Sequence, residues 1–133
     1  MTSLQLKVDL FCTREHVFDA YTDTAKQSAI TGAPAVADGK IGGMFALWSS
    51  AVTGVFVALR RPELIVQTWR THDFENNEPD SRVEIRLQST PQGCRFIVTQ
   101  DQIPKRLHKQ FVNGWTSAYF KDLAAWTAQA NIH

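Results

Sequence analysis

The sequence predicts an α+β domain in which a long C-terminal helix packs on an antiparallel sheet. Three observations predict this class: one strand-like segment followed by two short helices, six consecutive strand-like segments, and a final amphipathic helix of about 25 residues. Because helices and strands are grouped and do not alternate, a doubly wound parallel sheet is excluded. The 133 residues contain no repeat or low-complexity linker, so we expect a single domain, residues 1–133.

The N-terminal segment predicts one strand and two short helices. From Leu4 to Leu10 every second residue is apolar, which is the period of a strand with one wet face. Thr13 can then cap a first short helix, and Asp23 can cap a second that runs to about Ile30.

Six strand-like segments follow, each bounded by turn residues such as Gly, Pro, Asn and Asp: Ala35–Ala37, Met44–Trp48, Val52–Leu59, Leu64–Thr71, Val83–Leu87 and Cys94–Gln100. Their short connections predict an antiparallel meander. Pro104 can start the last helix, whose apolar residues share one face: Leu107, Phe111, Trp115, Ala118, Tyr119, Leu123 and Trp126. We expect this face to lie on the sheet.

Composition excludes several classes of partner. With 14 Lys and Arg against 13 Asp and Glu, the net charge of +1 favours neither nucleic acid nor an anionic membrane. The sequence lacks an apolar run long enough to span a bilayer and a secretory start, so we expect a cytoplasmic protein, either a monomer or a homodimer. Cys12 and Cys94 form neither a disulfide framework nor a C-x-x-C pair, and we expect two reduced, partly buried thiols.

Motifs for nucleophilic, phosphoryl or metal chemistry are missing from the sequence. We therefore predict no catalytic residue, no metal ligand and no cofactor. His108 and Asp122 lie beside the apolar face of the last helix and could act as a base or an anchor if they faced a cavity. We interpret them as rim residues. The charged residues that follow His72 and Asp73 indicate a solvated loop.

Six aromatic residues predict either a filled core or the wall of a pocket: Trp48, Phe56, Trp69, Phe111, Trp115 and Tyr119. A dry void of about 300 Å³ would cost about 7 kcal/mol, which rivals a typical domain stability of about 5 to 15 kcal/mol. A pocket must therefore hold water or a ligand, or these side chains must fill it. Gln67 precedes Trp69 by two residues and would share its face. If Trp69 faces inward, Gln67 is either a polar anchor for a ligand or a partner of a neighbouring side chain; the alternative is that both face outward.

The element order and four local motifs resemble the family of heat-shock protein 90 ATPase activator homologues, which belongs to the START-like, helix-grip superfamily. The motifs are Gly42-Gly43-Met44-Phe45, Val52-Thr53-Gly54, Trp69-Arg70, and Gly114-Trp115 with Tyr119-Phe120. The resemblance covers Leu4 to Trp126. It implies a curved seven-stranded antiparallel sheet with the first strand beside the last, the long helix across the concave face, and a cavity between them. This strand order would also bring Cys12 toward Cys94.

The resemblance implies three functions that the residues leave open. The first is binding of a small apolar or amphipathic molecule by Trp48, Phe56, Gln67, Trp69, Phe111, Trp115 and Tyr119. The second is a co-chaperone that stimulates a chaperone ATPase in the stress response, for which we expect an exposed apolar patch. The third is a cyclase-like or hydrolase-like enzyme, which needs a buried titratable group beside the cavity.

Overall fold

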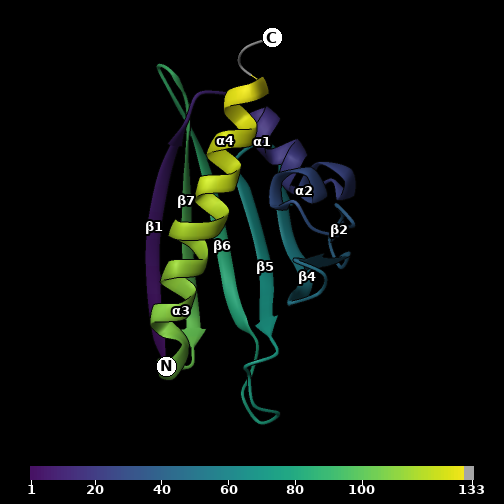
Figure 1. Ribbon diagram of the computed structural model, residues 1–133, viewed down its shortest axis with the longest axis vertical. Helices are drawn as coiled ribbons and strands as arrows, with labels where there is room; N and C mark the ends of the chain where they lie inside the picture. The colour runs from purple at the N-terminus through teal and green to yellow at the C-terminus, as the bar shows by residue number, and fades with distance from the viewer. Residues whose placement is uncertain (131–133) are drawn as a thin grey trace.

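A seven-stranded antiparallel sheet curves around one long helical segment in the computed structural model of the protein (Figure 1). The structure describes residues 1–130, and residues 131–133 of the predicted domain lie outside this range. The strands are β1 (Thr2–Leu10), β2 (Val36–Ala37), β3 (Met44–Leu47), β4 (Val52–Arg60), β5 (Leu64–Thr71), β6 (Ser81–Thr90) and β7 (Gly93–Ile103). Two short helices, α1 (Arg14–Tyr21) and α2 (Thr24–Thr31), follow β1. The predicted α+β helix-grip fold is confirmed.

The strand order is β1-β7-β6-β5-β4-β3-β2, so strands β2 to β7 form the predicted meander. β1 closes the sheet beside β7, with Leu10 opposite Cys94. β6 and β7 are longer than the sequence predicted, because the turn at Pro91 and Gln92 lets Thr90 pair with Gly93 and extends the ladder to the hairpin end.

Both predicted helix caps are confirmed. The Thr13 hydroxyl accepts a hydrogen bond from the His16 amide at 3.2 Å, and the Asp23 carboxylate accepts one from the Lys26 amide at 2.9 Å. These bonds satisfy backbone donors that a helix start leaves without a partner. Gly32 ends α2 with a φ of 72°, a left-handed conformation that suits glycine.

The C-terminal helical segment differs from the regular helix that the sequence predicted. It begins with a 3₁₀ turn (Lys105–Leu107), continues as α3 (His108–Asn113), widens into the π-helical segment η2 (Gly114–Tyr119), and ends as α4 (Phe120–Ala130). In η2 the Phe120 amide donates to the Trp115 carbonyl, five residues back. The wider turn buries Trp115, Tyr119 and Phe120 together, and all three rings contact Phe96 of β7. A strict 3.6-residue period cannot place these three side chains on one face.

The core lies between the concave face of the sheet and this helical segment, which crosses the sheet in Figure 1. Within residues 1–130, helices that are both long and apolar enough to cross a membrane are absent.

We predict that Gly54→Ala destabilises the fold. A Cβ atom at Gly54 would lie 2.2 Å from the Thr68 carbonyl oxygen and 2.6 Å from the Phe45 ring, so β4 and β5 would have to separate. We expect a loss of about 1 to 3 kcal/mol in the free energy of unfolding, measured by urea denaturation. Gly114→Ala is the control: a Cβ there has nothing within 4 Å, and we expect a gain of about 0.5 to 1 kcal/mol. Equal stability of Gly54→Ala and the wild type would contradict the packing described above.

Candidate functional site

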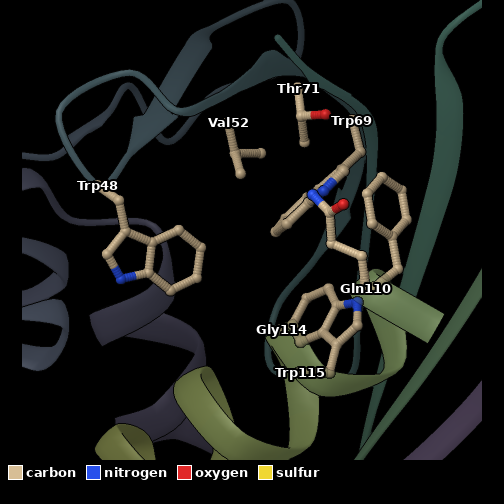
Figure 2. Close-up of a pocket in the computed structure, with 8 residues that line it drawn as sticks. Trp48, Val52, Trp69, Thr71, Gln110, Gly114 and Trp115 are labelled. Carbon is tan, nitrogen blue, oxygen red and sulfur yellow. The ribbon is translucent and has the colours of Figure 1, made fainter. Parts of the chain in front are cut away.

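An aromatic-walled pocket of about 130 Å³ lies between the sheet and the start of the long helical segment (Figure 2). Gln110, an exposed residue of the lining, lies at the rim where the pocket opens to solvent. Eight residues line it: Trp48, Val52, Trp69, Thr71, Gln110, Phe111, Gly114 and Trp115. Four of them, Trp48, Trp69, Phe111 and Trp115, are among the seven side chains that the sequence singled out.

Two tryptophans form the inner wall of the pocket. Trp69 of β5 and Trp115 of η2 pack with their ring centroids 4.9 Å apart and their planes tilted by 31°. Figure 2 shows the half-buried indole of Trp48 across an open gap from this pair. The edge of Trp48 contacts Tyr119 at a centroid distance of 6.2 Å. The pocket is therefore a slot with indole rings on both sides.

The turn that carries Trp48 has an unusual backbone. Trp48, Ser49 and Ser50 have φ angles of 50°, 56° and 70°, a left-handed conformation that non-glycine residues rarely adopt. The Ser49 amide donates to the Pro34 carbonyl at 2.9 Å, and a His72 ring nitrogen lies 3.0 Å from the Ser50 carbonyl. Each residue in such a conformation costs about 1 to 3 kcal/mol of folding free energy, and it persists only where the surrounding structure holds it in place. Here the strain positions the Trp48 ring at the pocket mouth.

A chain of buried hydrogen bonds holds the inner wall. The Trp115 indole N–H donates to Gln100 Oε1 at 2.9 Å, Gln100 Nε2 donates to Ser81 Oγ at 2.9 Å, and Ser81 Oγ donates to the Trp69 carbonyl at 2.7 Å. Each of these groups is buried, so each would lose stability without its partner. The two tryptophans of the wall are thus fixed by polar contacts as well as by packing. The sequence analysis missed Gln100 and Ser81, although Gln100 follows Val98 by two residues and Ser81 precedes Val83 by two, which puts each on the buried face of its strand.

Three of the predicted site residues, Phe56, Gln67 and Tyr119, lie in the core beside the pocket and not in its wall. Gln67 faces inward with Trp69, which decides between the two orientations left open, and its Oε1 accepts a hydrogen bond from the Tyr21 hydroxyl at 2.6 Å. Within residues 1–130, its Nε2 has no hydrogen-bond partner. The Gln67 oxygen therefore bonds a neighbouring side chain, as one of the alternatives stated, and the Gln67 nitrogen does not.

Tyr119 also finds a partner inside the protein. Its hydroxyl donates to Oε1 of the buried Gln27 at 2.8 Å. Burial raises the pKa of Tyr119 and of Tyr21 well above the ordinary value of a phenol. Both hydroxyls are therefore protonated at neutral pH and act as hydrogen-bond donors.

Four lining residues were not predicted: Val52, Thr71, Gln110 and Gly114. The position of Thr71, two residues after Trp69 on the same strand, gives it the same face and could have identified it. Gln110 lies in α3 and Gly114 at the start of η2, and neither has an apolar side chain that would have marked it as part of the buried face.

The loop between β5 and β6 borders the pocket mouth and is attached to the helical segment. Arg106 contacts the Glu78 carboxylate through two hydrogen bonds of 2.6 and 2.7 Å, and Gln110 Nε2 donates to Asp73 at 2.8 Å. Phe74 is only 8% exposed and stacks on Phe111 at 5.9 Å. The charged residues of this loop are exposed or half-buried, as predicted, whereas Phe74, for which the sequence analysis made no prediction, is buried because the loop folds back onto α3.

None of the eight lining side chains titrates near neutral pH. His108 lies outside the pocket wall, and its Nδ1 is 2.7 Å from the Thr2 hydroxyl. Asp122 is partly exposed on α4 and also lies outside the wall. Both positions agree with our interpretation of these two residues as rim residues.

We predict that Glu78→Gln lowers stability at neutral pH and that this difference disappears in acid. The Arg106 guanidinium lowers the pKa of Glu78 from 4.5 to about 2. The carboxylate therefore stabilises the folded state fully above pH 4.5, and this contribution is lost as the pH falls toward 2. Urea denaturation at stepped pH should show the wild-type and variant stabilities converging over this range. A difference that stays constant down to pH 2 would contradict the ion pair.

Comparisons with known protein families, sequences and structures agree with one another. The family described as "Activator of Hsp90 ATPase homolog 1-like protein" matches residues 12–128. An activator of 90 kDa heat shock protein ATPase homolog from Dictyostelium discoideum is 25% identical over 114 residues. This match covers 85% of the chain and 30% of that relative, so the chain spans less than a third of its length.

Solved structures share the fold. The crystal structure of an HSP90 activator from Plasmodium falciparum has a TM-score of 0.84 at 25% identity, over 91% of this chain and 92% of that one. The solution structure of the Aha1 dimer from Colwellia psychrerythraea has a TM-score of 0.82 at 8% identity, over 96% of each chain, and shows the fold alone. From the family match over nearly its whole length and from this fold, the chain belongs to the family of Activator of Hsp90 ATPase homolog 1-like proteins.

Proposed function

We propose that the protein binds a small, uncharged, single-ring aromatic molecule in the slot between Trp48 and the Trp69–Trp115 pair. The observation that carries this proposal is the pocket itself, with indole rings on both sides and open access at Gln110. Flat aromatic molecules gain both apolar burial and ring stacking in such a slot.

The volume of the pocket limits the size of the ligand. An engineered apolar cavity of about 150 Å³ binds benzene, whereas drug-sized ligands need about 300 to 1,000 Å³. A pocket of about 130 Å³ therefore fits one ring. Left dry, the same volume would cost about 3 kcal/mol at roughly 24 cal/mol per Å³, which ligand binding would recover.

The polar groups of the pocket limit the charge of the ligand. Gln67 and Tyr119 lie outside the pocket wall, so we assign the polar contacts to the lining residues Thr71 and Gln110. The Thr71 hydroxyl accepts from the Asp73 amide at 3.3 Å, and its own proton can be donated to a ligand. Without a charged side chain in the wall, an ionised ligand would lose its hydration without compensation.

We predict that Gly114→Leu blocks this binding. The substitution adds four carbon atoms at a pocket-lining position where a Cβ has nothing within 4 Å, and leucine is a better helix former than glycine. Phenol and benzyl alcohol should bind the wild type, measured by tryptophan fluorescence and ligand-observed NMR. Gly114→Leu should weaken both by at least about tenfold, or about 1.4 kcal/mol.

Ser117→Leu, which adds a similar side chain at an exposed position of η2 outside the pocket wall, is the matched control and should bind like the wild type. Benzoate should bind more weakly than benzyl alcohol, because the wall offers its carboxylate no cation. Native mass spectrometry of the purified protein tests in addition for a bound molecule. If the wild type and Gly114→Leu respond equally to every ring compound, the pocket is not the binding site.

A second candidate function, a chaperone-interacting module, is supported by a separate observation. Four apolar side chains are exposed on β2 to β4 and the loop between β2 and β3: Val36, Ile41, Met44 and Val57 are 50%, 68%, 67% and 49% exposed. Val36 pairs with Ala46, two residues from Met44, so Val36 and Met44 share the sheet face opposite the buried Phe45. Exposed apolar patches of this kind mark interaction surfaces.

We predict that Met44→Lys combined with Val57→Lys abolishes any stimulation of an HSP90 ATPase by this protein. Both side chains are solvent-exposed, so the fold should be retained, while two charges would oppose an apolar contact. Phe11→Lys, at an exposed apolar residue outside this patch, is the control. Steady-state ATPase assays with each variant measure the effect. Lack of stimulation by the wild type, or full stimulation by the double variant, would exclude this function for the patch.

A further inference from the structure

Cys12 and Cys94 lie side by side at the end of the sheet opposite the pocket. Leu10, the last residue of β1, pairs with Cys94, and Cys12 follows two residues later. The chain at Cys12 is pressed onto the start of β7: a Cβ atom at Gly93 would lie 2.8 Å from the Cys12 nitrogen and 2.9 Å from its carbonyl oxygen. The two cysteines are therefore neighbours, and both are free thiols in this structure.

The two thiols differ in access to solvent. Cys94 is fully buried, with none of its surface exposed. Cys12 is half-buried and lines an open surface hollow of about 400 Å³ between the β1–α1 connection and the β6–β7 hairpin. Arg14 also lines this hollow. A small reagent in solution can therefore reach Cys12 first, with Cys94 directly behind it.

The contact also sets the order of ionisation. The hydrogen bond from the Cys94 thiol lowers the pKa of Cys12, whereas the same contact and burial raise the pKa of Cys94. The Thr127 hydroxyl also lies within hydrogen-bond reach of Cys12, although it donates to the Leu123 carbonyl at 2.9 Å. Cys12 is thus the nucleophile of the pair, and Cys94 holds its proton.

We propose that Cys12 and Cys94 form an oxidation site for hydroperoxides, in which Cys12 reacts first and Cys94 closes a disulfide. This inference rests on the juxtaposition of one accessible and one buried thiol and is independent of the function proposed for the pocket. Pocket-lining residues and residues of the thiol hollow are two separate sets.

The proposed oxidation of the two thiols by a hydroperoxide proceeds in two steps. The Cys12 thiolate attacks one oxygen of the hydroperoxide and the O–O bond breaks, so that Cys12 becomes a sulfenic acid. The other oxygen leaves as hydroxide or alkoxide and takes up the proton that Cys12 released to solvent on ionisation, giving water or an alcohol. The Cys94 sulfur then attacks the Cys12 sulfur, the S–O bond breaks, and the hydroxide leaves as water with the Cys94 proton. Two thiols are oxidised by two electrons and one hydroperoxide is reduced. A dithiol reductant reverses the reaction by exchange.

The disulfide would close a chain segment that contains every strand from β2 to β6. Such a long loop restricts the unfolded chain strongly, so oxidation should make the folded state harder to unfold. Because Cys12 follows two residues after the partner of Cys94 and its backbone lies against Gly93, the bond requires little movement of β7.

The test treats the reduced wild-type protein with hydrogen peroxide, alkylates the remaining thiols and measures intact mass. The wild type should lose about 2 Da, the mass of two hydrogens, and take up no alkyl group. Non-reducing peptide mapping should join the Cys12 and Cys94 peptides. Dithiothreitol should restore the original mass, and the oxidised protein should melt roughly 5 to 10 °C higher than the reduced one.

Single variants separate the roles of the two thiols. Cys94→Ser should stop at the Cys12 sulfenic acid, which dimedone traps. Cys12→Ser should leave Cys94 unreacted, because it is buried. Gly114→Leu should oxidise like the wild type, which separates this test from the ligand test. If a variant fails to fold, peptide mapping of the wild type alone is sufficient. Oxidation without a Cys12–Cys94 link, or equal reactivity of both cysteines, overturns the proposal.

Discussion

The hydrogen bond between Trp115 and Gln100 is the constraint on which the rest of the structure depends. A buried indole N–H needs an acceptor, and only one rotation of the helical segment brings Trp115 over Gln100 of β7. That rotation places the Trp115 ring against Trp69 and the Phe120 ring against Phe96. The helical backbone permits this rotation by widening into a π-helical turn at the same residues. The orientation of the helix on the sheet is thus decided by one polar contact inside an apolar interface.

The irregular backbone of the protein is concentrated around the pocket. The π-helical segment carries Gly114 and Trp115, and the left-handed turn carries Trp48, so both walls of the slot depend on conformations that regular elements do not provide. Between them, the buried chain from Gln100 to Ser81 keeps the inner wall rigid. A preformed slot of this kind needs little reordering when a ligand enters, which favours binding of a small molecule that offers few contacts of its own.

The features proposed to carry function occupy separate parts of one sheet. The pocket is lined by residues of β4, β5, α3 and η2 together with Trp48, whereas the thiol pair lies beside the β6–β7 hairpin. In Figure 1 this hairpin lies at the top and α3 at the bottom. The exposed apolar side chains of β2 to β4 face away from the core that fills the concave side. Antiparallel strands allow this division because alternate residues of one strand point to opposite faces of the sheet. The two ends of each strand also lie at different sites.

The sequence by itself determined the α+β class, the order of the elements, the helix caps at Thr13 and Asp23, and that Gln67 shares one face of its strand with Trp69. These features depend on local hydrogen bonding and on the period of apolar residues, which can be read along the chain. Only the tertiary structure decided which aromatic residues face the pocket, that Gln67 and Tyr119 bond to Tyr21 and Gln27, and that Phe74 is buried. The partners in these contacts lie far apart in the sequence, and the π-helical turn that sets the geometry of the wall is stabilised by packing against the sheet and not by local propensity.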